Sequence, residues 1–145
     1  MSDSATRQLA VGLKHVAKIT VTDDMTPAHL RSEPLRVLST PDMIRLIERT
    51  AIEAVQPYLA PGQATVGTRV DVAHLAGTLV GMTVTITVEL TEVDRRKLTF
   101  RVEVRDELDE AGRGTHERFI VDGAQRLPRL QDKLSRWKAA GGQPA

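Results

Sequence analysis

Two side chains suited to acid and base chemistry, Glu48 and His74, stand at unusual places in the sequence pattern. Glu48 falls on the margin of the apolar arc of a predicted helix, away from that helix's charged side. His74 continues the apolar face of a predicted strand. Thr40 stands at the predicted helix start, where backbone N–H groups favour developing negative charge. Together these residues can activate water or a nucleophile, meeting within one subunit or across two.

Each of these residues also has a structural interpretation. Thr40, followed by a proline and an aspartate, is a sufficient helix N-cap. Glu48 can extend to solvent or pair with Arg45 or Arg49 on the same helix. His74 can be a hydrogen-bonded histidine at the end of a strand. The residues alone leave both interpretations open.

A second group of polar residues lies on predicted strands. Gly67 inside a strand pattern indicates a bulge or close helix packing, or a backbone that a ligand can approach. Alternation in the last strand puts Glu117 on one face and His116 and Arg118 on the other, so the three cannot all serve one pocket. For Glu117 we expect a cross-strand ion pair. No histidine has the ligand spacing of a zinc site, and no metal is expected.

Composition excludes several classes of function. The chain has 145 residues, with 20 Lys and Arg against 19 Asp and Glu, no Cys, and few aromatic residues. A net charge of +1 disfavours nucleic-acid binding, the absence of a long apolar run excludes a membrane span, and the absence of Cys excludes disulfides. We expect no membrane partner and a cytoplasmic location. Residues 1–10 and 138–145 are predicted to be flexible tails around one domain at 11–137.

Hydrophobic periodicity predicts one long helix and five strands. The helix begins at Thr40, with Pro41 at its first position, and is closed by Pro57 and by Pro61 and Gly62. Alternation predicts strands at residues 15–22, 65–75, 84–90, 98–104 and 114–121, with polar connections at 94–96 and 106–112. A short C-terminal helix is expected to pack on or cap the domain through one apolar stripe, which consists of Leu127, Leu130, Leu134 and Trp137.

The order of these elements specifies the fold class. One apolar helix must be covered by one sheet with an apolar face, which gives a two-layer α+β domain whose antiparallel sheet curls around the helix. Such a sheet leaves an edge strand, and pairing of two copies is expected.

Three segments resemble a known family when their order and spacing are taken together. They are PYLAPGQATVGT at residues 57–68, VAHLAGTLVGMTVTITVEL at 72–90 and RGTHERFIV at 113–121. With Thr40, Glu48 and His74 they resemble the fluoroacetyl-CoA thioesterase-like family of hotdog-fold thioesterases over residues 11–125. The resemblance implies a homodimer with acyl-CoA sites at the subunit interface and the catalytic set Thr40, Glu48 and His74. It also implies that Gly67 and Arg118 line the acyl site, and that coenzyme A is part of the substrate, with no separate cofactor.

The chemistry of these residues is compatible with thioester hydrolysis. A thioester releases a thiol whose pKa is about 8.5, so it leaves as a thiolate with little acid assistance. Glu48 then attacks the carbonyl or orients water, His74 transfers the proton, and Thr40 with the helix N-terminus holds an oxygen. The sequence does not choose between the covalent and water routes.

One departure from the family concerns the acyl group. The family's fluoroacetate-specific member has an aromatic lid, whereas residues 31–38 here contain no aromatic residue. We therefore expect a short or medium acyl-CoA as substrate, without assigned selectivity for fluorine. The CoA phosphates need basic neighbours, which Arg95, Arg96, Lys97 or Arg126 can supply, although a solvated hairpin also explains the first three.

Two alternative functions remain. A hotdog acyl-CoA hydratase would carry an Asp and His pair on its loop and helix segment, whereas this helix offers Glu48 without His. A non-catalytic acyl or small-ligand binding protein would keep the dimer cleft without turnover. Retention of Thr40, Glu48 and His74 together argues against it.

Overall fold

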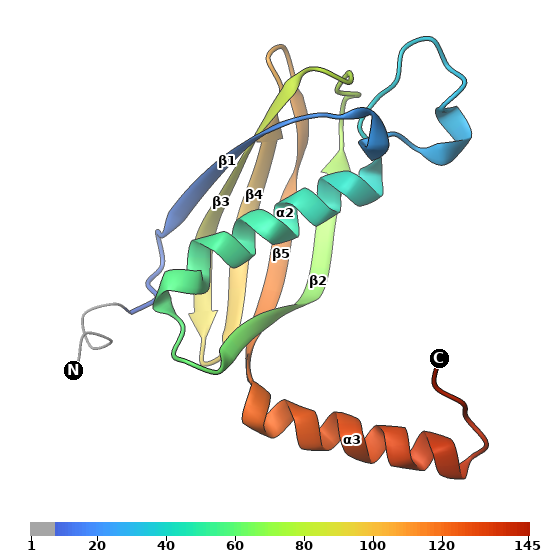
Figure 1. Ribbon diagram of the computed structural model, residues 1–145. Coiled ribbons are helices and arrows are strands. Elements are labelled where there is room, and N and C mark those ends of the chain that lie inside the picture. Colours follow the sequence, from blue (N-terminus) through green and yellow to red (C-terminus); the bar gives the residue numbers. More distant parts are fainter. Residues whose placement is uncertain (1–7) are drawn as a thin grey trace.

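Alternating apolar and polar residues build one five-stranded antiparallel sheet, seen behind the central helix in Figure 1. The computed structural model describes residues 8–145, so part of the predicted N-terminal tail lies outside the described residues. The order across the sheet is β1, β3, β4, β5, β2. The strands are β1 (Lys14–Thr20), β2 (Gln63–His74), β3 (Thr83–Asp94), β4 (Lys97–Arg105) and β5 (Glu110–Asp122). The predicted α+β architecture is confirmed.

The central helix α2 (Thr40–Val55) is followed by the short helix η3 (Gln56–Tyr58). Its N-cap is Ser39, whose hydroxyl accepts a hydrogen bond of 3.1 Å from the backbone N–H of Asp42. The prediction that Thr40 is the cap was therefore wrong by one residue. The preceding serine is an equally good cap, and a proline is tolerated in the first turn at either position. Because Ser39 does the capping, the hydroxyl of Thr40 is free for another partner.

The core lies between α2 and the face of the sheet that it covers. Every second residue is buried in β4 and in β3 as far as Leu90, as the alternation predicts. The buried side chains of α2 fall on one stripe and meet this face: Met43, Leu46, Ile47, Thr50, Ala51, Ala54 and Val55. Phe100 of β4 is the largest fully buried side chain.

Strand boundaries differ from prediction mainly where turn chemistry decides them. The β3–β4 connection is the predicted polar hairpin, with Arg95 in the left-handed region at a φ of 57°. The β4–β5 turn ends earlier than predicted, because the Asp106 carboxylate accepts hydrogen bonds of 2.8 Å from the backbone of Leu108 and Asp109. Strand β5 therefore begins at Glu110, four residues before the predicted Gly114.

Residues 21–39, between β1 and α2, contain two short helical turns, η1 (Asp23–Met25) and η2 (Ala28–Leu30). They lie at the same end of the sheet as the β2–β3 connection and the β4–β5 turn (Figure 1). This group of connections, residues 21–39, 75–82 and 106–109, is called the loop end below. Among residues 8–145, no helix is long and apolar enough to cross a membrane.

The C-terminal helix α3 (Gly123–Ala139) stands away from the sheet at the opposite end (Figure 1). All of its residues are exposed, so the prediction that it packs on or caps its own domain was wrong. Helix α2 already covers the apolar face of the sheet, which leaves α3 nothing to cover within the chain. Its end is well defined by a Schellman motif, in which the N–H of Gly142 donates to Trp137 O and that of Gly141 to Lys138 O.

The two phenylalanines of the chain test this description of the core. We expect Phe100→Ala to lower the free energy of unfolding by about 3–5 kcal/mol, because it opens a cavity in a fully buried site. Phe119, with an exposed fraction of 41%, is the matched control, and Phe119→Ala should cost about 1 kcal/mol or less. Urea denaturation of both variants measures the difference, and equal losses would contradict the assigned core.

Candidate functional site

Glu48 projects from the flank of α2 toward strands β5 and β2. Its Oε2 accepts a hydrogen bond of 3.2 Å from Nη1 of Arg118, which also makes the pair an ion pair. The Arg118 side chain is 4% exposed, whereas the Glu48 side chain is 39% exposed. Arg45 and Arg49 pair instead with other carboxylates of α2. The buried cation of Arg118 thus fixes the position of Glu48, while part of the Glu48 side chain remains exposed to solvent.

Each nitrogen of the Arg118 guanidinium takes part in a hydrogen bond. Its Nε donates to Thr65 Oγ1 at 2.8 Å and its Nη2 to the Thr65 carbonyl at 2.9 Å. Burial lowers the pKa of Arg118, and the neighbouring carboxylate of Glu48 opposes that change. Arginine stays protonated in such surroundings, so Arg118 acts as a fixed positive charge behind Glu48. It is a positioning group, because its side chain is buried.

His116 completes this buried network and was not singled out by the sequence as a site residue. Its Nε2 lies 3.1 Å from Nη1 of Arg118, which can only donate, so Nε2 accepts. Its Nδ1 then carries the proton and donates to the carbonyl of Arg69 at 2.8 Å. Burial lowers the pKa of His116, with the Arg69 carbonyl opposing and the charge of Arg118 adding to the effect. His116 is therefore a neutral imidazole that supports Arg118.

Gly67 lies directly against the Glu48 carboxylate. A Cβ atom added to Gly67 would stand 2.4 Å from Oε2 of Glu48 and 3.2 Å from Nη1 of Arg118. The strand register shifts between Gly67 and Arg69, which is the predicted bulge. The structure therefore brings together three of the predicted site residues, Glu48, Gly67 and Arg118.

Thr40 and His74 form a second pair. The Oγ1 of Thr40, at the start of α2, is joined to Nδ1 of His74, at the end of β2, by a hydrogen bond of 2.7 Å. This is the partner that the hydroxyl of Thr40 gains because Ser39 caps the helix. The imidazole is half-buried and faces the N-terminal turn of α2.

The two groups lie two helical turns apart along α2. Thr40 and Glu48 are separated by eight residues, which is about 12 Å at 1.5 Å per residue. Within the described part of the chain, no hydrogen bond links Glu48 to His74. One subunit therefore positions the acid and the imidazole but does not join them.

Glu117, on the opposite face of β5, does not form the predicted cross-strand ion pair. Its Oε2 accepts a hydrogen bond of 2.7 Å from the hydroxyl of Thr68. Thr68 is the bulged residue between Gly67 and Arg69, and the bulge brings its hydroxyl to this position. The predicted separation of Glu117 from His116 and Arg118 is confirmed.

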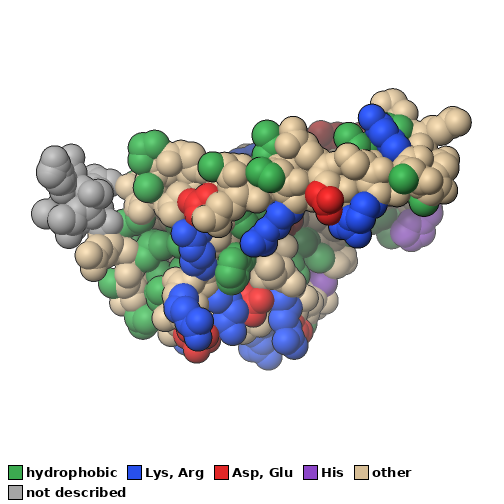
Figure 2. All heavy atoms as spheres, turned by 90° about the horizontal axis from the view of Figure 1, so that it is seen from below, with side chains coloured by type: hydrophobic (Ala, Val, Ile, Leu, Met, Phe, Trp, Pro, Cys, Tyr) green, Lys and Arg blue, Asp and Glu red, His purple; other side chains and the backbone are tan. Residues whose placement is uncertain are grey.

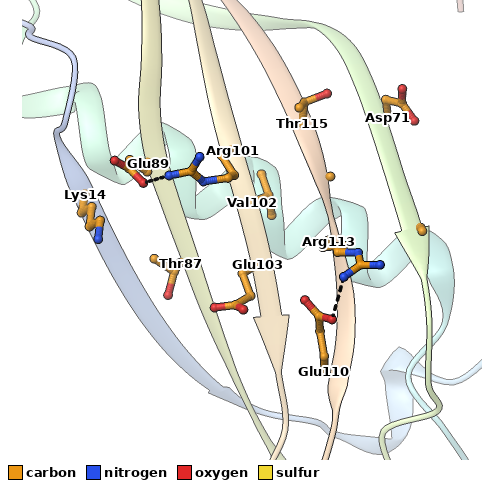
Figure 3. A pocket seen from close by; sticks show the side chains of 12 residues that line it. Lys14, Asp71, Thr87, Glu89, Arg101, Val102, Glu103, Glu110, Arg113 and Thr115 are labelled. Carbon is orange, nitrogen blue, oxygen red and sulfur yellow. Dashed lines mark hydrogen bonds and ion pairs between the residues drawn. The ribbon is translucent and has the colours of Figure 1, made fainter.

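A large hollow lies elsewhere, on the outer face of the sheet. It has a volume of ≈ 670 Å³, and charged side chains line it, including the paired Glu89 and Arg101 and the paired Glu110 and Arg113 (Figure 3). None of the predicted site residues lines it. We interpret it as the solvated back of a curved sheet. No group of side chains in residues 8–145 has the make-up of a metal site.

The pKa of His116 predicts how stability changes with pH. Since burial holds the folded-state pKa below the ordinary value of 6.5, the unfolded chain takes up this proton first on acidification. Stability present above pH 6.5 is therefore lost as the pH falls toward the folded-state value. Urea denaturation at several pH values should show a smaller loss for His116→Gln, which cannot be charged there. Equal losses in the two proteins would contradict a neutral, buried His116.

Comparisons with known proteins identify the family of the chain. The family model described as fluoroacetyl-CoA-specific thioesterase matches residues 21–124. A fluoroacetyl-CoA thioesterase of Streptantibioticus cattleyicolor is 45% identical over 85 residues, which cover 59% of this chain and 61% of that relative. The matched segment thus spans less than two thirds of that relative's length.

Solved structures extend the likeness to the fold. A structure of the fluoroacetyl-CoA thioesterase FlK superposes with a TM-score of 0.79 at 35% identity, covering 86% of this chain and 97% of that one. A hot-dog-like protein from Thermanaerovibrio acidaminovorans superposes with a TM-score of 0.79 at 24% identity, covering 91% and 97%. The predicted hotdog fold is confirmed, and the chain belongs to the family of fluoroacetyl-CoA-specific thioesterases.

Proposed function

We propose that this protein is an acyl-CoA thioesterase that hydrolyses a short or medium acyl-CoA to the free acid and coenzyme A. The observation that carries the proposal is the Glu48 carboxylate, held by buried Arg118 against the bare backbone of Gly67. An oriented, partly exposed carboxylate beside a strand without a side chain suits an acyl carbonyl that must approach closely. Family membership supports the same reaction.

We further propose a homodimer formed by antiparallel pairing of the β2 edges of two copies. Strand β2 is an edge of the sheet, and its consecutive residues Gly67–Asp71 are all exposed to solvent. Antiparallel pairing about a two-fold axis sets the His74 end of one β2 beside the Gln63 end of the other. This arrangement moves the partner subunit's His74 toward Glu48, which the single chain does not achieve.

The roles of these residues follow from their groups. Glu48 adds to the thioester carbonyl or orients the water that does so, and the thiolate of coenzyme A departs as the tetrahedral intermediate collapses. Where Glu48 itself adds, water then cleaves the resulting acyl–glutamyl anhydride, which releases the acid and restores the carboxylate. His74 takes up and returns the proton, and its hydrogen bond to Thr40 fixes the ring. Thr40, in the first turn of α2, holds an oxygen of the acyl group. Arg118 holds the Glu48 carboxylate in place and directs it through their hydrogen bond.

The proposal also covers the acyl pocket, the contact with the CoA phosphates and the cellular location. Residues 31–38 contain no aromatic residue, which supports a pocket without an aromatic lid. Arg95 is 93% exposed and only loosely paired with Asp94 at 3.9 Å, whereas Arg96 is paired with Asp122 at 2.9 Å. Arg95 is therefore the better candidate for a CoA phosphate. An acyl-CoA substrate and a chain without cysteine favour the cytoplasm.

Substitution of the two titrating residues tests the reaction. We expect wild-type protein to release free thiol from a panel of acetyl-, fluoroacetyl-, longer and aryl acyl-CoAs. Glu48→Gln and His74→Ala should each lower kcat by about 100-fold or more, because each removes a group that takes part in proton transfer or attack. Glu53→Gln on α2 and His29→Ala on η2 are matched controls, since both side chains lie outside the candidate site. A thiol-release assay on folded variants gives the rates.

Different outcomes separate the alternatives. Unchanged rates in either site variant would contradict the assignment. Binding of acyl-CoA without thiol release from any thioester would favour the ligand-binding protein. Hydration of an enoyl-CoA without thiol release would favour the hydratase.

Gly67 gives a finer test of the Glu48 position. In Gly67→Ala the new methyl group would overlap Oε2 of Glu48, a flexible side-chain end that can move aside. We therefore expect a stable fold with kcat lowered by about 10- to 100-fold, because a displaced carboxylate loses its orientation. Ala64→Gly, also on β2 but without a predicted role, is the control. Circular dichroism and the thiol-release assay together would show the effect, and full activity would argue that Glu48 does not act from its observed position.

A further inference from the structure

Helix α3 carries an apolar stripe that the rest of residues 8–145 leaves largely exposed, apart from the contact of Trp137 with the backbone of Gly142. Leu127, Leu130, Leu134 and Trp137 recur at intervals of three and four residues, so they share one face of the helix. Their exposed fractions are 56%, 47%, 38% and 48%. Four large apolar side chains exposed to solvent on one face indicate an interaction surface.

A second exposed apolar group lies at the other end of the sheet. The loop end exposes five large apolar side chains: Leu35, Leu75, Leu79, Val80 and Leu108. Leu108, at the tip of the β4–β5 turn, is 80% exposed, and Leu35 is 72% exposed. These residues cannot reach α3 of the same chain, because α3 starts after Asp122, at the far end of β5.

The two surfaces are complementary in charge. Helix α3 has five basic side chains and one acidic side chain. The loop end has six acidic and two basic side chains, the acidic ones being Asp23, Asp24, Glu33, Asp106, Glu107 and Asp109. Figure 2, the view from below that faces α3, shows Lys and Arg side chains interspersed with hydrophobic ones. Opposite charge around apolar centres is the pattern of a specific protein interface.

The direction of α3 sets which copy it can meet. In Figure 1, α3 and the loop formed by residues 21–39 both extend past the β2 edge, at opposite ends of the sheet. A two-fold axis at that edge exchanges the ends, so each α3 reaches the loop end of the other copy. The two α3 helices lie at opposite ends of such a dimer and cannot pair with each other. The basic residues beside the stripe, such as Arg126 and Lys133, would also repel a second α3.

We propose that the apolar stripe of α3 packs on the loop end of the partner subunit. The inference rests on the homodimer described under the proposed function. It adds an interface to that dimer at each end of the shared β2 edge. At each end, α3 of one subunit contacts the loop end of the other. The loop end also leads into α2 at Thr40, so the helix of one subunit supports the segment that positions the partner's Thr40 and His74.

Trp137 reports on this contact, because it is the single tryptophan of the chain. In the dimer we expect its fluorescence to be shifted to the blue and protected from acrylamide, relative to the folded protein diluted until it is a monomer. Leu108→Asp combined with Leu79→Asp should abolish both effects while the fold persists, since both side chains are exposed. Val16→Asp changes a residue on β1 whose exposed fraction, 50%, lies between those of Leu79 (40%) and Leu108 (80%), and it should leave both effects intact.

Crosslinking gives an independent measurement in a chain that has no cysteine. Mixed dimers of Leu134→Cys with Leu79→Cys or Leu108→Cys should form an intersubunit disulfide on mild oxidation. Asp132→Cys, on the opposite face of α3, is the control and should not crosslink with either partner.

The outcomes distinguish this inference from the proposed function. If sedimentation shows a dimer, but acrylamide quenches Trp137 fully and no crosslink forms, the inference is overturned. The thioesterase proposal is left standing by that result. A monomer would overturn both this interface and the shared site. A dimer with protected Trp137 but no thiol release would support the interface and contradict the proposed function. Protection of Trp137 that appears only with anionic phospholipid vesicles would assign the stripe to a lipid surface and overturn the inference.

Discussion

The buried guanidinium of Arg118 is the interaction on which the candidate site depends. A charge with 4% exposure is tolerated only where every donor has a partner, because removal from water costs several kcal/mol. Thr65 and His116 satisfy two sides of the group, and the remaining side faces Glu48. The fold thus needs an acceptor at the place where the proposed reaction needs an oriented carboxylate. Stability and the proposed chemistry therefore involve the same pair.

The pattern of α2 shows how far sequence reasoning reaches. The helical period locates the buried stripe, and it marks Glu48 as a carboxylate on the margin of that stripe. It cannot identify the partner, because Arg118 is 70 residues away and is brought close only by the pairing of β5 with β2. Local alternatives such as Arg45 and Arg49 are all that helical spacing can offer. The network behind the carboxylate is therefore a product of tertiary structure.

Turn and cap chemistry account for the other differences. Ser39 and Thr40 are both good N-caps, and sequence preference alone does not rank them. The choice matters because it leaves the Thr40 hydroxyl to His74. His116 looked like one member of a polar cluster, and only its burial shows that it is neutral and supports Arg118. A signal was present in the alternation of β5, which placed His116 and Arg118 on one face.

In the proposed dimer, the edge strand β2 has a second role, because Glu48 lies beside Gly67 of this strand and His74 lies at its end. A free edge is an aggregation hazard that a closed two-fold pairing removes. The pairing proposed above would bring the His74 end of one β2 strand toward the Glu48 carboxylate of the other subunit. Charge segregation fits this arrangement as well: a net charge of +1 hides a basic α3 and an acidic loop end. The net charge of the whole chain averages these two surfaces. Only the fold shows that both extend past the β2 edge, at opposite ends of the sheet (Figure 1).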